Sequence, residues 1–356
     1  MAEKNLKTML AELIDDVGRE GASDLHLAEG RRPSIRVSGT LIPLIRREVL
    51  AKAEAEALLS LILRPGDKEI FTKEKQVDFS WSSPEGARFR GNAFFQQGAI
   101  SIALRMIPKS IRTLTELNLP PVLKSFTDRQ QGFFLVVGPI GHGKSTTLAS
   151  LIEIINSSRP EHIVTIEDPI EYVYEAKQSI VDQREVRIDT PDFQSALDSI
   201  FRQDADVVLI GEMRELRTIA TAVTAAETGH LVFSTLHTNS ASQTIERILD
   251  IFPSNQQDQI RVQLAGSLTG IFSQRLVPRV SGGLIPAFEL LINNNAVANL
   301  IRERRTHEIN TVIETSLDQG MISLDRSLAE LVRAGEITSE NAFLYSLNPK
   351  VLERLI

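Results

Sequence analysis

Nine consecutive residues in the middle of the chain have the types and spacing of a phosphate-binding loop. The pattern G-x-x-x-x-G-K-[S/T] is met by the eight residues Gly138, Pro139, Ile140, Gly141, His142, Gly143, Lys144 and Ser145, and Thr146 follows as the ninth residue of the segment. Its glycines let successive backbone N–H groups converge on phosphates, and the helix that follows adds the positive end of its dipole. We expect Lys144 to reach the β- and γ-phosphates of ATP and Ser145 to hold Mg²⁺.

Acidic residues follow two later apolar segments, where strands are expected to end. Gly211 and Glu212 follow one of them. Because many P-loop ATPases place an acid there to activate the attacking water or to bind Mg²⁺ through water, we assign Glu212 as the general base. The alternative is a solvated glutamate that caps the next helix. The other segment ends in Glu167, Asp168 and Glu171, which either position Mg²⁺ or water or form an ordinary acidic turn.

Histidines and arginines supply further candidate groups. His230 and His237 flank an apolar strand-like segment, and a donor there could sense the γ-phosphate. Spacing alone does not decide between the two histidines. Arg88, Arg90 and Arg105 lie on two strand-like runs near the N-terminus, where they are either solvated side chains or, as in many oligomeric ATPases, groups that stabilise phosphate charge in a neighbouring subunit.

The elements that must position these residues form two patterns. Residues 1–107 read as a small α+β domain with a mostly antiparallel sheet, and the proline-rich segment 108–121 reads as a linker. Residues 122–356 alternate short apolar strands with longer helices, which indicates a parallel sheet covered on both faces. From about 253 the pattern is mainly helical apart from 284–291, and a helical C-terminal part is expected at about 292–356.

Composition narrows the class of protein. The formal net charge is −7 and no long basic block is present, so we expect no nucleic-acid partner. No apolar run approaches the roughly 18 residues of a membrane span, and the N-terminus mixes acids and bases unlike a signal peptide. With no cysteines in the chain, a cytoplasmic protein is expected.

Together the motifs resemble the type II/IV secretion ATPase superfamily, and most closely the retraction ATPases of the type IV pilus. The resemblance is carried by the segments SDLHL, RFRGNAFFQQG, ALRMIP, GPIGHGKSTTLASLI, HIVTIEDPIEYVY, VDQREV, FRQDADVVLIGEMRE, TAAETGHLVFSTLHTNSA, RILDIFP and AVANLIRE. They cover nearly the whole chain, in the family's order. This order is far more specific than the loop alone.

The resemblance implies a PAS-like N-terminal domain, a RecA-like ATPase domain with a helical C-terminal region, and a hexamer with nucleotide between subunits. It selects His230 as the conserved histidine, Glu167 and Glu171 as Asp-box acids, and Glu212 as the Walker B glutamate, and leaves His237 unassigned. It also makes Arg90 and Arg105 expected contacts of the ATP phosphates. The implied cofactors are ATP and Mg²⁺. The implied partners are a pilus platform protein of the inner membrane and a paralogous pilus ATPase. The implied location of the chain is peripheral, at the cytoplasmic face of that membrane.

Several positions depart from the family pattern. The family's usual loop reads GPTGSGKS, whereas this chain has Ile140 and His142 at the third and fifth positions. Both positions are variable, and there the backbone binds the phosphates. Ala205 and Glu215 replace a usual proline and aspartate, and the late motif AIRNLIRE reads AVANLIRE, with Ala298 in place of arginine. The alternatives to retraction are a pilus assembly or secretion ATPase, a RecA-like nucleic-acid translocase, and a non-hydrolysing subunit of a mixed ring.

Overall fold

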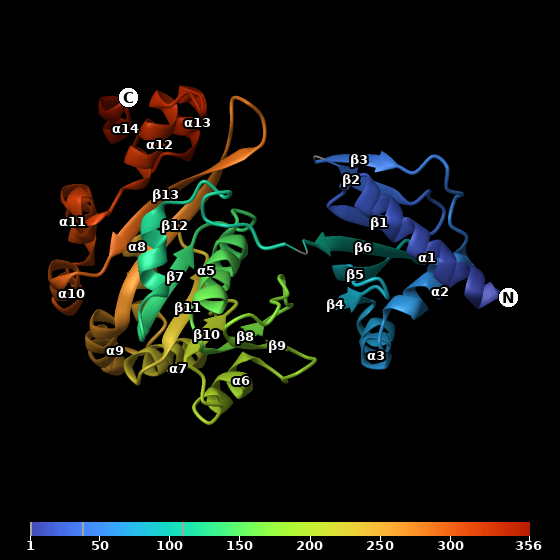
Figure 1. The fold of residues 1–356 in the computed structure, drawn as a ribbon, viewed down its shortest axis with the longest axis horizontal. Helices are drawn as coiled ribbons and strands as arrows, with labels where there is room; N and C mark the ends of the chain where they lie inside the picture. The colour runs from blue at the N-terminus through green and yellow to red at the C-terminus, as the bar shows by residue number, and fades with distance from the viewer. Residues whose placement is uncertain (1, 38, 109) are drawn as a thin grey trace. The chain divides into compact units, whose positions relative to one another are not determined.

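The computed structural model describes residues 2–37, 39–108 and 110–356, and it forms two compact units, Met1–Ser110 and Ile111–Ile356 (Figure 1). Each unit has its own sheet and hydrophobic core. The second unit includes most of the segment predicted as a linker, because Leu114 and Leu119 are buried in its core. Among the helices described, none combines the length and apolar composition of a membrane span.

The N-terminal unit is an antiparallel sheet with helices on its apolar face. Its elements are α1 (Ala2–Arg19), β1 (Asp24–Ala28), β2 (Ser34–Val37), β3 (Thr40–Pro43), α2 (Lys52–Ile62), α3 (Pro65–Glu74), β4 (Gln76–Ser82), β5 (Arg88–Gln96) and β6 (Ala99–Ile107). The strand order is β3-β2-β1-β6-β5-β4. Leu13 and Val17 of α1 and Leu58 of α2 are fully buried with the strand side chains of that face. Polar residues occupy the other face, as the alternating pattern requires.

The second unit is built on a seven-stranded sheet. Its strands are β7 (Gly132–Val137), β8 (His162–Glu167), β9 (Ile180–Glu185), β10 (Val207–Ile210), β11 (Leu231–Leu236), β12 (Leu268–Pro278) and β13 (Leu284–Ile292), in the order β13-β12-β7-β11-β10-β8-β9. All neighbouring pairs are parallel except β12 with β13. The predicted α/β class, with a parallel sheet in the second part, is confirmed.

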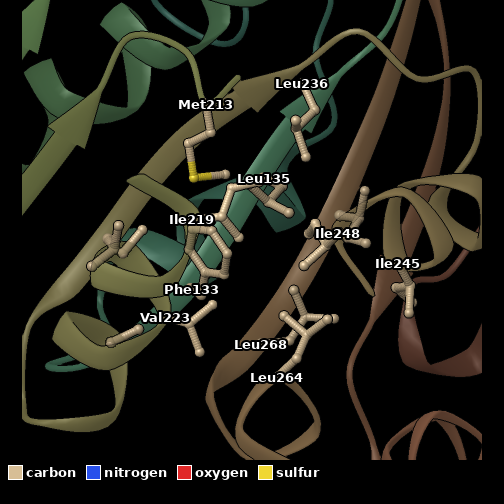
Figure 2. Close-up of a cluster of buried hydrophobic side chains, with 14 of the residues drawn as sticks. Phe133, Leu135, Met213, Ile219, Val223, Leu236, Ile245, Ile248, Leu264 and Leu268 are labelled. Carbon is tan, nitrogen blue, oxygen red and sulfur yellow. The ribbon is translucent and has the colours of Figure 1, made fainter. Parts of the chain in front are cut away.

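Helices cover both faces of this sheet. They are α4 (Lys124–Thr127), α5 (Lys144–Ser158), α6 (Phe193–Ile200), α7 (Leu216–Glu227), α8 (Ala241–Asp250), α9 (Ser254–Ser267), α10 (Asn295–Arg302), α11 (Ile309–Thr315), α12 (Leu324–Arg333), α13 (Ser339–Tyr345) and α14 (Pro349–Leu355), with 3₁₀ turns at Pro121–Leu123, Thr306–Glu308 and Leu317–Gln319. Helices α4 and α5 share one hydrophobic cluster with the sheet. Helices α6 to α11 share the cluster of the opposite face, in which Phe133 and Leu135 of β7 meet Ile219 and Val223 of α7 (Figure 2).

Two strands of this sheet were not expected from the sequence. Strand β12 lies in a region predicted to be mainly helical. The strand was not predicted because its position between β7 and β13 buries both of its faces, which removes the alternation of apolar and polar residues. Strand β9 is an edge strand of mixed polarity, IVDQRE. The predicted helical C-terminal part is present, and α12 to α14 pack against the end of the β12–β13 hairpin through Val277, Ile285 and Ala287.

Candidate active site

The carboxyl ends of four parallel strands bring the predicted site residues to one edge of the sheet. The phosphate-binding loop follows β7, Glu167 ends β8, Gly211 and Glu212 follow β10, and His237 follows β11. Because β7, β11, β10 and β8 are consecutive neighbours and parallel, segments distant in sequence converge there. Such an edge is where doubly wound sheets bind their ligands.

The phosphate-binding loop turns sharply between β7 and α5. Gly138, Gly141 and Gly143 all have positive φ angles, of 140°, 80° and 81°. A Cβ atom at Gly138 would lie 2.3 Å from the carbonyl oxygen of Gln274, so glycine is required there by contact as well as by φ. The tight turn leads directly into α5 at Lys144, which places the loop at the helix N-terminus.

Lys144 is folded onto the loop. Its Nζ donates to the carbonyl oxygens of Gly138 at 2.9 Å and Pro139 at 2.8 Å, and it lies 3.2 Å from Nδ1 of His237. Burial lowers the pKa of Lys144 to about 8, against the opposing attraction of Glu171 and Glu212. A phosphate group would restore the charged form, because an adjacent anion favours the ammonium.

His237 connects Lys144 to Glu212. Its Nδ1 faces the ammonium group, while its Nε2 lies 3.4 Å from Oε2 of Glu212. A neutral imidazole with the proton on Nε2 satisfies both contacts, since it accepts from lysine and donates to the carboxylate. The other oxygen of Glu212 is 2.6 Å from the guanidinium of Arg214. The side chain assigned as general base is therefore oriented by two neighbours rather than free in solvent.

Glu167 is the buried acid of the site, with 8% of its surface exposed. Its Oε1 accepts from Thr165 Oγ1 at 2.7 Å and from Gln183 Nε2 at 3.2 Å, and its Oε2 accepts from the backbone N–H of Glu171 at 3.3 Å. Burial raises the pKa of Glu167 to about 7, although these hydrogen bonds oppose the shift. A carboxyl that titrates near neutrality can take up or release a proton at physiological pH.

The first turn of α5 completes the loop. Ser145 is the second residue of the helix, and Thr146 Oγ1 is 2.8 Å from the hydroxyl of Tyr172. The donor set at this edge, a serine hydroxyl with the carboxylates of Glu212 and Glu171, consists of the hard oxygen ligands that Mg²⁺ prefers. Together with the glycine turn and Lys144, these residues fit a magnesium–nucleotide complex.

His230 lies at the opposite edge of the sheet. It precedes β11, whereas the phosphate-binding loop follows β7, and β7 and β11 are parallel. Its Nδ1 is 3.0 Å from the carbonyl oxygen of Ala225, and its ring packs edge-on against Phe201. Within one chain, His237 and not His230 lies beside Lys144 and Glu212, because the length of β11 separates the two histidines. Whether His230 contributes to a site shared with another copy stays a prediction.

Arg90 and Arg105 belong to the N-terminal unit, where they are direct partners on the neighbouring strands β5 and β6. Arg105 is 70% exposed and donates through Nε to Asp24 at 2.9 Å. Arg90 is exposed on the same face of the sheet. The two guanidinium groups thus share a polar face suited to anions, and their contact with phosphates stays a prediction.

Two residues that support the loop could not be predicted from local sequence. Gln274 lies on the unexpected strand β12 and hydrogen-bonds both the carbonyl oxygen of His142 and the hydroxyl of Thr147. Tyr172 follows Glu171 of the acidic cluster, but its position in the sequence does not connect it to Thr146, whose hydroxyl it contacts in the structure. Only pairing between distant segments brings these groups together.

Comparison with known proteins places both units in one family. The family described as type II/IV secretion system protein matches residues 2–311. The chain is 44% identical to the type IV pilus retraction ATPase PilT of Pseudomonas aeruginosa, over 94% of this chain and 96% of that protein. It is 38% identical to the type IV pilus ATPase PilU of the same organism, over 95% of this chain and 88% of that one.

A solved structure of the pilus retraction motor PilT with bound ADP is similar throughout. It superimposes with a TM-score of 0.91 at 44% identity and covers 96% of this chain and 98% of its own. Sequence and fold therefore agree over both units. The chain belongs to the type II/IV secretion system protein family.

Proposed function

We propose that this chain is a hexameric motor ATPase that hydrolyses ATP to drive retraction and disassembly of a type IV pilus, and so twitching motility. The observation that carries the proposal is the likeness to the retraction ATPase PilT over both units, at 44% identity and a TM-score of 0.91. The P-loop and the acids at one sheet edge support the ATPase activity independently of that likeness.

At this edge, nucleotide phosphates compete with the protein for Lys144. The ammonium group donates to two loop carbonyls and to His237, and an incoming γ-phosphate offers it a stronger, charge-assisted partner. When Lys144 turns to the phosphate, Nδ1 of His237 loses its donor. Because Nε2 of the same ring contacts Glu212, the general base senses whether the γ-phosphate is present.

Hydrolysis then requires a water molecule held in line with the γ-phosphate. Glu212 accepts a proton from that water, while Lys144 and the backbone N–H groups of the loop stabilise charge on the phosphoryl oxygens. Ser145 would hold the Mg²⁺ that accompanies ATP, Glu212 would contact it through water, and the ion would neutralise phosphate charge. Glu167 and Glu171 complete the acidic side of this edge and help to place the water.

In the assembled ring, Arg90 and Arg105 supply cations to the nucleotide from the N-terminal unit. Motion of one unit against the other, about the segment that joins them, couples hydrolysis to a pilus platform protein at the cytoplasmic face of the inner membrane. A paralogous ATPase of the PilU type is a further partner. Each of these assignments rests on the family likeness.

One position favours a second candidate, a pilus assembly or secretion ATPase of the same family. Ala298 stands where the retraction motif has arginine, and it is only 7% exposed within α10. The charged group of that motif is thus missing from this helix position. ATP hydrolysis is common to both candidates, so the direction of the motor is what separates them.

Three experiments test the proposal. Purified Lys144→Ala should lose ATP binding and turnover, whereas Glu212→Gln should bind ATP and not hydrolyse it. An unchanged rate in Glu212→Gln would remove the assigned general base.

Deletion in the parent organism, followed by microscopy, decides the direction of the motor. Hyperpiliated cells that do not retract their pili support retraction, and cells without pili mean assembly. Stimulation of turnover by single-stranded nucleic acid would instead indicate a translocase.

A further inference from the structure

Strand β12 contacts the phosphate-binding loop through the side chain of Gln274. This side chain is 3% exposed, and both ends of its amide are used. Nε2 donates to the carbonyl oxygen of His142 at 2.9 Å, and Oε1 accepts from Thr147 Oγ1 at 2.6 Å. One side chain therefore ties the loop to the first turn of α5.

A second tie runs from the loop to the strand through the imidazole of His142. Its Nδ1 accepts the backbone N–H of Leu276 at 2.8 Å. Strand β7 pairs with β12 only as far as Val137 opposite Ser273, because the chain then turns into the loop. Beyond that point the N–H of Leu276 has no β7 neighbour, and a backbone donor left without an acceptor is costly. His142 supplies the acceptor that the missing strand would have provided.

The imidazole is held in the form that this bond requires. Burial lowers the pKa of His142, and the nearby charges of Arg275 on β12 and Lys144 on α5 lower it further. The ring of Tyr345 on α13 stands edge-on to it, with centroids 6.4 Å apart. A neutral ring with the proton on Nε2 leaves Nδ1 free to accept from Leu276.

The fit between strand and loop leaves little freedom for the residues that contact phosphates. A Cβ atom at Gly143 would lie 2.9 Å from Nε2 of Gln274, and one at Gly138 would lie 2.3 Å from its carbonyl oxygen. Lys144 follows Gly143 directly. The path of the backbone between Gly138 and Lys144 is therefore set against β12, and the direction of its N–H groups is set with it.

We propose that His142 is a positioning residue for ATP: by accepting the N–H of Leu276, its imidazole fixes the phosphate-binding loop in the conformation that receives the phosphates. This inference rests on the proposed ATPase function and adds a side-chain role at a loop position where the backbone alone was expected to act. Gln274 stabilises the same loop by donating a hydrogen bond to the carbonyl oxygen of His142.

Two substitutions distinguish the two ring nitrogens. In His142→Asn, the amide oxygen can take the place of Nδ1 and accept from Leu276. In His142→Gln, the amide lies at the distance of Nε2 and does not reach that N–H. Loss of one such bond weakens binding by about fivefold to tenfold. We expect the KM for ATP and the Kd for a fluorescent ATP analogue to rise by this factor in His142→Gln, with kcat changed less than about twofold, and both to stay near wild type in His142→Asn.

The full-length purified chain is used throughout, with His307→Gln as the matched control, since His307 is exposed on a 3₁₀ turn. Circular dichroism establishes folding, and His142→Ala replaces the glutamine variant if that variant does not fold. Equal KM values in the asparagine and glutamine variants, or a fall in kcat without a change in KM, would overturn the positioning role. A wild-type chain that neither binds nor hydrolyses ATP would instead overturn the proposed function.

Discussion

Replacement of Glu167 by glutamine tests how strongly the fold perturbs a buried acid of the site. The carboxyl is 8% exposed, and burial raises its pKa from 4.5 to about 7. Between these two values the unfolded chain ionises while the folded chain retains the proton. The unfolded state then binds fewer protons, so the stability of the wild-type protein falls as the pH rises through this window.

The magnitude follows from the size of the shift. A shift of one pKa unit corresponds to about 1.4 kcal/mol, so the raised pKa of Glu167 lowers the stability of the folded chain by roughly 3 kcal/mol at pH 8 and by about 1 kcal/mol at pH 5. Glutamine has nearly the same shape and carries no charge to bury. It presents an N–H group to one of the three donors that face Glu167, which removes about 1 kcal/mol at every pH.

The stability of Glu167→Gln relative to wild type should therefore rise by about 2 to 3 kcal/mol between pH 5 and pH 8. Urea unfolding, followed by far-UV circular dichroism at several pH values in nucleotide-free buffer with a chelator, measures this difference. The matched control is Glu353→Gln, which removes one carboxylate that is exposed on α14. Parallel curves for Glu167→Gln and wild type across this range would refute the reasoning, because they would mean that burial does not disfavour the charged form.

Three further outcomes are expected. The pKa of Lys144 is about 8, and a bound phosphate favours the ammonium form, so ATP binding at pH 8.5 should take up a substantial fraction of a proton. Calorimetry in buffers of different ionisation enthalpy measures this proton uptake. Zero uptake would contradict the lowered pKa. Gly138→Ala should destabilise the chain by about 2 kcal/mol or more, because the added Cβ meets a backbone oxygen. In Gly141→Ala the added Cβ enters open space, so this variant should lose only about 1 kcal/mol, from the strain of its positive φ. Ala298→Arg should lower stability by about 2 kcal/mol in urea unfolding, since the helix position is buried; unchanged stability would show that a guanidinium fits there.

Local sequence determined the parts of this protein that depend on neighbours in the chain. The loop from Gly138 to Ser145 was identified because its glycines, lysine and serine act at fixed spacing between one strand and one helix. The parallel sheet followed from short apolar runs alternating with helices. The acids at Glu167 and Glu212 were found because they end such runs, where a parallel sheet exposes its carboxyl edge.

Tertiary structure decided what depends on contacts between distant segments. Strand β12 has no alternating pattern because both of its faces are buried, so the sequence did not predict it and gave no role to Gln274. The two histidines that flank β11 are equivalent by type and spacing, and only the direction of the strand within the sheet places His237, rather than His230, beside Lys144 and Glu212. The side chain of His142 acquires a partner only because β7 ends before β12 does. Spacing along the chain specifies which groups a segment offers, and the register of the sheet specifies which of them meet.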